Sequence, residues 1–288
     1  TKIHPFIQLD GIIGALHTPE DGHTDPTSTT NAMAKGARNS GAEIYRHNRV
    51  TNINQLPNDE WELVTEKGNI ICEHVVNAAG SFCPEVGQMV GLKNIPSINM
   101  IHHYLVTDEH PEIKKLDKEL PVVRDPHSSC YLRQEGKGLL IGIYEKNAKC
   151  WALDGMDWKF DMELLEPDLD RLEEHLKKGM DRIPQFRDVG IKRIICGPIT
   201  HTPDGNFLAG PAPGLRNFWM FCAASVGIAQ GGGAGKYMAQ WMIYGDADIN
   251  MLEFDPRRYL SWAHKDYAVA KCTDEYKRMY VTPLPNES

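Results

Sequence analysis

The sequence predicts an α/β fold in which one domain is split in two and a second, mostly antiparallel domain is inserted between its halves. Helical and strand patterns alternate over residues 1–85, and strand pairs joined by tight turns fill residues 86–195. Within residues 196–245 a buried strand leads back into a helix. The remaining residues, 246–288, end in a polar segment with prolines, and we expect a linker towards a C-terminal domain there.

The first expected helix spans Thr27–Ser40. Asp25 suits the N-cap, Pro26 suits the first turn, and Gly41 suits the left-handed position after the helix. Alanines and a glycine within the helix leave room for close packing against a sheet. A strand is expected to follow over Glu43–Ile53.

A β-hairpin is expected next. Its arms are Trp61–Glu66 and Ile70–Ala79, joined by a turn at Lys67–Asn69. The second arm ends in Val75–Gly80, with the sequence VVNAAG. A strand that stops at small residues and a glycine lets another group approach its backbone closely.

The middle of the chain favours antiparallel strands and one helix. Met100–Thr107 has the pattern of a strand, and Tyr131–Gln134 and Leu139–Tyr144 form a second expected hairpin around a turn with two glycines. Pro167–Ile183 is the strongest helix pattern, because its apolar residues recur three or four positions apart between charges.

A glycine-rich stretch, CAASVGIAQGGGAGKYMAQWM (residues 222–242), joins the buried strand pattern of Phe218–Ala223 to a helical one. It is not a phosphate loop, because Lys236 is followed by Tyr237 rather than Ser or Thr. It is not a dinucleotide fingerprint, because no second strand ending in an acidic residue follows. Two interpretations remain with equal weight: a helix start that binds negative charge beside a flat ligand, or tight packing of helix on sheet.

Composition excludes some classes of function. The net charge of −8 argues against a nucleic-acid partner, and no apolar run approaches the ~20 residues of a membrane-spanning helix. The seven cysteines include no CxxC pair, so we expect reduced thiols. No metal is expected, because His4, His17, His23 and the cysteines lack the spacing of metal ligands.

Several segments carry a family resemblance and keep the family's order and spacing: Gly14–Arg38, Val75–Gly80, His102–Pro111, Tyr131–Glu145, Gly197–Trp219, Gly227–Trp241 and Asp255–Tyr259. Together they resemble the flavin oxidoreductase module of the dimethylglycine dehydrogenase and sarcosine dehydrogenase family, among the D-amino-acid-oxidase-like flavoproteins. The resemblance implies a partial, Rossmann-like FAD-binding domain (1–85 and 196–245) and an inserted substrate-binding sheet domain (86–195). Family members also carry an N-terminal GxGxxG motif and a C-terminal folate-binding domain, so we expect a fragment lacking both.

The same resemblance implies an activity. It is the FAD-dependent oxidative N-demethylation of a small methylated amino acid, dimethylglycine ahead of sarcosine, by hydride transfer to the flavin. Electrons would pass to an electron-transfer flavoprotein or to oxygen. FAD attachment through a histidine and tetrahydrofolate binding would both involve residues outside this chain. The implied compartment is the cytoplasm in a bacterium or the mitochondrial matrix in a eukaryote. The alternative is a non-catalytic fragment or subunit that does not bind FAD alone.

Motif matching assigns the active-site residues. His102 in HHYLVT and Tyr131 in YLRQEG match the family's catalytic histidine and tyrosine, and Arg133 joins them as a residue for binding the substrate. A histidine suits the task because the amine must be neutral to be oxidised. The alternatives are a core histidine, a half-buried strand tyrosine, and an arginine paired with a nearby acid. His103 is expected to point to the opposite face of the strand.

The resemblance also assigns residues to the cofactor. Val50 matches a position whose backbone meets the adenine end of FAD, and Tyr131 lies near the flavin. The remaining residues belong to the glycine-rich stretch and would lie against the flavin ring: Val226, Gly227, Ile228, Ala229, Gly231, Gly232 and Gly233. The helix start would face the edge of the ring where negative charge accumulates on reduction.

Overall fold

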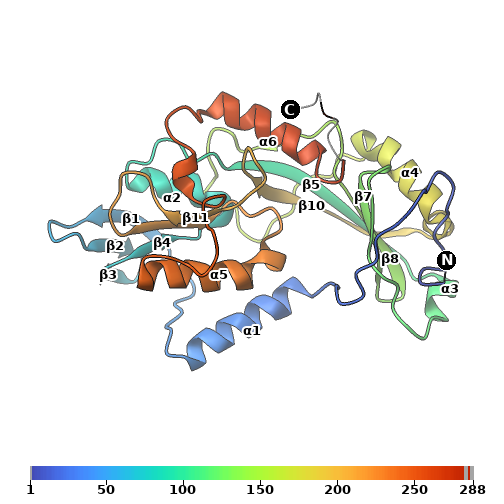
Figure 1. Ribbon diagram of the computed structural model, residues 1–288, viewed down its shortest axis with the longest axis horizontal. Coiled ribbons are helices and arrows are strands. Elements are labelled where there is room, and N and C mark those ends of the chain that lie inside the picture. Colours follow the sequence, from blue (N-terminus) through green and yellow to red (C-terminus); the bar gives the residue numbers. More distant parts are fainter. Residues whose placement is uncertain (1, 282–284, 286–288) are drawn as a thin grey trace.

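A computed structural model describes residues 2–281 and 285 of the chain and has the expected mixed α/β architecture (Figure 1). In this part of the chain the helices are α1 (Pro26–Asn39), α2 (Cys83–Met89), α3 (Pro111–Lys114), α4 (Glu173–Arg182), α5 (Gly227–Tyr244) and α6 (Lys265–Lys277). The strands are β1 (Val50–Gln55), β2 (Trp61–Thr65), β3 (Gly68–Cys72), β4 (Val75–Asn77), β5 (Ile98–Thr107), β6 (Val123–Asp125), β7 (Cys130–Glu135), β8 (Gly138–Ile143), β9 (Cys150–Trp151), β10 (Ile191–His201), β11 (Leu208–Pro211) and β12 (Phe218–Cys222). Of the expected linker, residues 282–284 and 286–288 lie outside the described residues.

Among the described residues the strands form three sheets. The largest has the order β10-β5-β8-β7-β6, with β9 also paired to β5, and all of its pairs are antiparallel. A second sheet, β11-β12-β4, contains the parallel pair β12–β4, and β1-β2-β3 form an antiparallel third. The expected α/β class is therefore confirmed, including the antiparallel middle of the chain.

The largest sheet buries its two faces against different helices. Leu105 of β5 and Ile141 of β8 pack with residues around α4, such as Leu172. On the other face Met100 of β5 packs with Cys272 of α6. Because successive side chains of a strand point to opposite faces, His102 shares the α6 face with Met100.

The N-cap of α1 is the expected one: the Asp25 carboxylate accepts a hydrogen bond from the Ser28 amide. Two predicted strands were wrong in extent. The strand expected over Glu43–Ile53 begins only at Val50. The expected arm Ile70–Ala79 is two strands, because β3 pairs with β2 whereas β4 pairs with β12 in another sheet.

Two predicted helices also differ from the structure. The helix expected over Pro167–Ile183 starts with a 3-10 turn at Asp170–Leu172 and is α-helical only from Glu173. The glycine-rich stretch is not a loop before a helix. Its glycines from Gly227 onward lie inside α5, whose N-cap is Val226.

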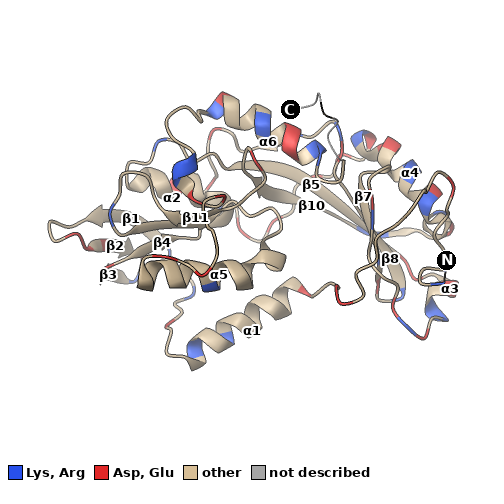
Figure 2. Cartoon of the chain, viewed as in Figure 1, with Lys and Arg blue, Asp and Glu red and all other residues tan. Residues whose placement is uncertain are grey.

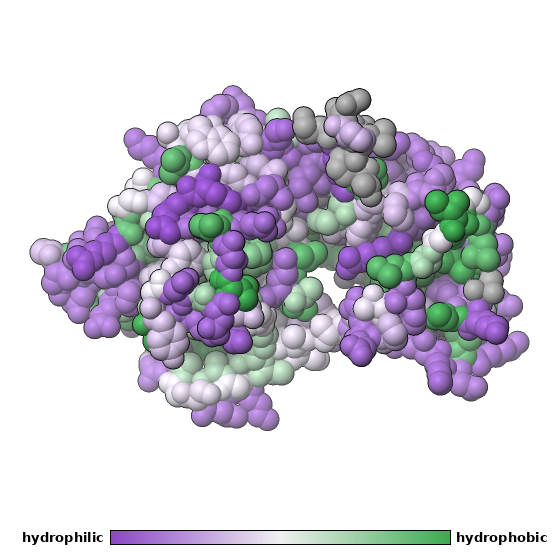
Figure 3. Space-filling model, in the orientation of Figure 1, coloured by the Kyte–Doolittle hydropathy of each residue, from purple (hydrophilic) through white to green (hydrophobic). Residues whose placement is uncertain are grey.

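Charge and hydropathy differ along the surface. Figure 2 shows acidic and basic residues mixed along α4 and α6, whereas α5 carries Lys236 as its only charged residue. Figure 3 shows pale to green side chains where α1 and α5 lie, and a hollow between them and the part of the molecule formed by β7 and β8. None of the described helices is long and apolar enough to cross a membrane.

Candidate functional site

His102 lies at the centre of a buried polar cluster, on β5. Its Nε2 is 3.1 Å from the Tyr131 hydroxyl and its Nδ1 is 3.0 Å from the Tyr276 hydroxyl. The side chain is 8% exposed, and its ring centroid is 4.7 Å from that of Tyr144. The structure therefore brings together the two residues, His102 and Tyr131, that motif matching placed in one active site.

A glycine allows Tyr131 to reach His102. β8 lies between β5 and β7, so the two side chains come from strands that are not neighbours. Tyr131 is paired across the sheet with Gly142 of β8, and a Cβ atom at Gly142 would lie 1.8 Å from Cζ of the tyrosine ring. The ring therefore occupies the space that a side chain on β8 would fill, and so approaches β5.

Burial keeps both partners uncharged. Burial, the largest cause, and the nearby His103, His201 and Arg171 together lower the pKa of His102 to about 3. Burial also raises the pKa of the Tyr131 hydroxyl well above its ordinary value. The cluster thus presents a neutral imidazole and a neutral phenol at neutral pH.

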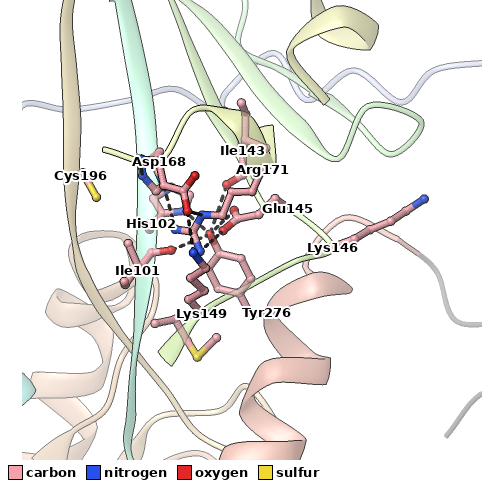
Figure 4. Close-up of polar contacts among 12 residues, drawn as sticks. Ile101, His102, Ile143, Glu145, Lys146, Lys149, Asp168, Arg171, Cys196 and Tyr276 are labelled. Carbon is pink, nitrogen blue, oxygen red and sulfur yellow. Dashed lines mark hydrogen bonds and ion pairs between the residues drawn. The ribbon is translucent and has the colours of Figure 1, made fainter. Parts of the chain in front are cut away.

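Behind His102 lies a chain of polar groups that sequence reasoning missed (Figure 4). The Tyr276 hydroxyl of α6 is 2.8 Å from Glu145 Oε2, and Glu145 Oε1 is 3.3 Å from Arg171 Nη1. Glu145 is fully buried, and burial raises the pKa of its carboxyl group. Glu145 ends one of the matched motifs, which was a usable signal. Tyr276 had none, because its segment was expected to be a linker.

His103 and Arg133 lie near this cluster, and each bonds to a residue outside it. His103 points to the opposite face, as expected, where its Nε2 accepts a hydrogen bond from the Asp168 amide at 3.2 Å. Arg133 is half-buried, and its Nη2 is 2.6 Å from Glu135 Oε2. The arginine therefore contacts the nearby acid that its alternative interpretation named.

The start of α5 is uncapped and apolar. No side chain caps the helix, so the amide groups of Gly227 and Ile228 have no acceptor within it. The side chains of Val226 and Ile228 are 39% and 42% exposed. In Figure 1 this end of α5 points towards the hollow seen in Figure 3.

Tight packing does not account for the glycines of α5. A Cβ atom at Gly231 or Gly233 would meet no atom within 4 Å, and at Gly232 it would be 3.4 Å from Met33 Cε of α1. Each interior glycine costs a helix about 1 kcal/mol relative to alanine. The described residues therefore give no packing reason for this cost, which weakens the second interpretation of the stretch.

The structure does not join all the predicted site residues into one contact network. The hydrogen bonds and ring contacts of His102 within residues 2–281 and 285 are with Tyr131, Tyr144 and Tyr276. None is with the start of α5. Val50, the first residue of β1, is half-buried beside a separate apolar core. In the same described residues, no group of three His, Cys, Asp or Glu is placed to hold a metal ion.

Comparison with known proteins gives the class of this fold. The family described as "FAD dependent oxidoreductase" matches residues 1–241, and "FAD dependent oxidoreductase central domain" matches residues 244–288. The crystal structure of L-proline dehydrogenase from P.horikoshii superposes with a TM-score of 0.75 and 25% identity, covering 89% of this chain and 66% of that one. The chain belongs to the FAD dependent oxidoreductase family.

Two named relatives narrow the similarity within that family. The chain is 40% identical over 99% of its length to mitochondrial dimethylglycine dehydrogenase of Rattus norvegicus, and 32% identical over 99% to mitochondrial sarcosine dehydrogenase of Mus musculus. These matches confirm the resemblance on which the motif assignments rest. The chain spans about a third of these curated relatives, 34% of the first and 31% of the second.

The residues at the start of α5 fit one end of such a cofactor. A flavin ring is flat and largely apolar, with hydrogen-bond acceptors along one edge. Exposed apolar side chains, free amide groups and glycines with open space beside them suit the face and the edge of such a ring.

Proposed function

We propose that this chain is the oxidoreductase part of a flavoprotein that oxidises a small methylated amino acid, with dimethylglycine ahead of sarcosine. The observation that carries the proposal is the contact between a neutral His102 and Tyr131 at the positions where the family motifs expect them. The higher identity to dimethylglycine dehydrogenase supports the order of the two substrates. The division into FAD-domain parts (1–85, 196–245) around a substrate-binding domain (86–195) is part of the proposal.

The chain's own residues would prepare the amine for oxidation. An ammonium nitrogen has no lone pair, so the substrate must first lose a proton. The neutral imidazole of His102 accepts that proton at Nε2 through the Tyr131 hydroxyl, which gives its hydrogen to Nε2 as it takes one from the bound amino acid. FAD, when bound, supplies the acceptor for the hydride. The amides of Gly227 and Ile228 would hold the edge of the ring.

The finer parts of the proposal follow from the resemblance. Electrons leave for an electron-transfer flavoprotein or for oxygen, and tetrahydrofolate takes up the released carbon in a domain outside this chain. Covalent attachment of FAD would also use a residue outside it. We place the protein in the mitochondrial matrix of a eukaryote or in the cytoplasm of a bacterium.

The visible absorbance of FAD bound to the chain tests the proposal directly. The purified chain supplied with FAD is expected to stay yellow after gel filtration, and its visible absorbance to bleach when dimethylglycine is added without oxygen. Sarcosine at the same concentration should bleach it more slowly. A colourless chain with no response would favour the alternative, a non-catalytic part that does not bind FAD alone.

Replacing His102 tests its role in the complete protein. His102→Ala is expected to lower kcat/KM by roughly 100-fold, the scale of general acid–base catalysis. His127→Ala is the matched control, because His127 is an exposed histidine of the same predicted domain. Equal kinetics for the two variants would remove His102 from the site.

A further inference from the structure

Tyr276 is the one residue of α6 whose polar group contacts His102. Its hydroxyl lies 3.0 Å from His102 Nδ1, 2.8 Å from Glu145 Oε2, and 3.3 Å from the carbonyl oxygens of Ile101 and Ile143 (Figure 4). We propose that Tyr276 is a positioning residue that fixes His102 in the tautomer with the proton on Nδ1, leaving the Nε2 lone pair, on the side of Tyr131, to act as the base. Its meaning for catalysis rests on the proposed function.

The Tyr276 hydroxyl has a single hydrogen to donate. Arg171 is 5% exposed at its side chain and cannot lose its charge, so it needs an anion, and Glu145 is fully buried beside it. Asp168 also approaches Arg171, at 3.7 Å, but its carboxylate is already bound by Lys149. An ionised Glu145 is a stronger acceptor than a neutral imidazole or a carbonyl, and it is also the closest group. The Tyr276 hydrogen therefore points to Glu145.

The direction of this hydrogen bond decides where His102 carries its proton. With its hydrogen given to Glu145, the Tyr276 oxygen can only accept from His102, so Nδ1 of the imidazole carries the proton. Nε2 then has a lone pair and accepts from the Tyr131 hydroxyl. All donors in this chain of bonds point the same way, from Tyr131 towards Glu145. If Glu145 were protonated, every bond would reverse, and Nε2 would carry the proton instead.

This tautomer decides which nitrogen of His102 acts as the base. Nε2 becomes the basic atom. As a substrate ammonium group gives a proton to the Tyr131 oxygen and its N–H bond breaks, the Tyr131 hydrogen moves to Nε2 and forms the new N–H bond there. The resulting imidazolium keeps its Nδ1–H bonded to Tyr276, which is bonded to the negative Glu145. The buried ion pair thus stabilises the charge that His102 acquires.

The packing of α6 against the sheet holds the Tyr276 hydroxyl in place. Ala268, Cys272 and Tyr276 are all buried and lie four residues apart, so they form one face of the helix against β5. Next to Tyr276, Glu275 is bonded to His201 of β10, which anchors the end of the helix. The Tyr276 ring is fully buried and has little freedom to rotate.

The test is the tautomer of His102, read from the 15N chemical shifts of the purified chain labelled in its histidines. The His102 signals are assigned by their loss in His102→Asn. The expected result is a protonated Nδ1 and an unprotonated Nε2 at pH 7. A wild-type protein with the proton on Nε2 would overturn the proposal, whether or not any variant folds.

Tyr276→Phe keeps the ring and removes the hydroxyl. The ratio of the Nδ1–H to the Nε2–H tautomer is expected to fall roughly fivefold to tenfold, the value of one hydrogen bond between neutral groups. Tyr280→Phe is the matched control, because Tyr280 contacts the Tyr131 and Tyr144 rings from the same end of the chain. An unchanged ratio in Tyr276→Phe, or an equal fall in the control, would reject the positioning role.

The two proposals can fail separately. If the expected tautomer is found but FAD-loaded protein does not oxidise any methylated amino acid, the proposed function fails and the role of Tyr276 in orienting His102 stands. If the amine is oxidised and the tautomer is unchanged by Tyr276→Phe, only the role of Tyr276 fails.

Discussion

At the scale of single residues, His102 and His103 make the stability of the protein depend on pH. Both are held neutral in the fold, with pKa values lowered to about 3 and about 4, and burial is the largest cause for each. In the unfolded chain they take up protons below about 6.5. The unfolded state therefore gains protons first as the pH falls, and the folded state loses relative stability.

We predict that the free energy of unfolding decreases from pH 6.5 down towards pH 4, by about 1.4 kcal/mol per pH unit for each of the two histidines. This stability is fully present above pH 6.5. Urea unfolding at several pH values measures the slope. His102→Asn should remove one histidine's share, and an unchanged slope in that variant would contradict the pKa shift.

The contact between Tyr131 and Gly142 gives a second prediction at this scale. Gly142→Ala should push the Tyr131 ring away from His102 and lower stability by roughly 1–3 kcal/mol, the usual cost of overpacking. Thermal unfolding measures the loss. Gly197→Ala is the control, because this glycine lies in the same sheet and an added Cβ meets nothing within 4 Å. Equal losses would show that the space beside Gly142 is not needed by the ring.

Sequence reasoning found part of the site because family motifs mark His102 and Tyr131 individually. It could not find Tyr276 or assign a role to Arg171, since each acts only through a partner far away in the chain. Burial, which sets the charge of His102, also depends on tertiary packing. The opposite orientation of His103 was predictable, because it follows from strand geometry alone.

At the scale of elements, α5 contains glycines that its own contacts do not require. We predict that Gly233→Ala raises the stability of the cofactor-free chain by about 0.5–1 kcal/mol, through a smaller loss of backbone entropy on folding. The same change should weaken FAD binding by roughly tenfold or more if the flavin lies against the helix.

Gly235→Ala is the matched control for that experiment. Gly235 lies in the same helix and also has open space beside it, but it is outside the residues predicted to face the flavin. It should give the same gain in thermal stability with unchanged FAD affinity, measured by flavin fluorescence. FAD affinities that fall equally in both variants, or in neither, would count against the proposed position of the ring.

Most elements were predictable from local patterns, and the errors lie where tertiary structure decides the outcome. The α1 N-cap, the β7–β8 hairpin and the strand β5 follow from spacing and turn residues. The split between β3 and β4 does not, because an apolar run looks the same whether it stays in one sheet or passes into another. The glycines of α5 were placed before the helix because glycine has low helix propensity, and the tertiary structure overrides that preference.

At the scale of the whole molecule, α1 is a helix that buries none of its side chains against the rest of the protein. It has no buried residue, and its Met33 lies near Gly232 of α5. We predict that its amides exchange with solvent much faster than those of β5 in the cofactor-free chain. FAD at 100 times its Kd should raise overall stability by about 2.7 kcal/mol and slow exchange in α1. Hydrogen-exchange mass spectrometry measures both, and protection of α1 equal to that of β5 without FAD would contradict the prediction.

The position of Tyr276 in the chain has a consequence for biosynthesis. The hydrogen bond between His102 and Tyr276 spans 174 positions in the sequence. Synthesis proceeds from the N-terminus, so β5, β7 and β8 leave the ribosome long before α6 does. Until α6 docks, its residues do not cover the face of β5 that carries Met100 and His102. The groups that orient the imidazole are therefore completed only when nearly all of the described chain has been made, so a nascent chain cannot assemble this cluster early.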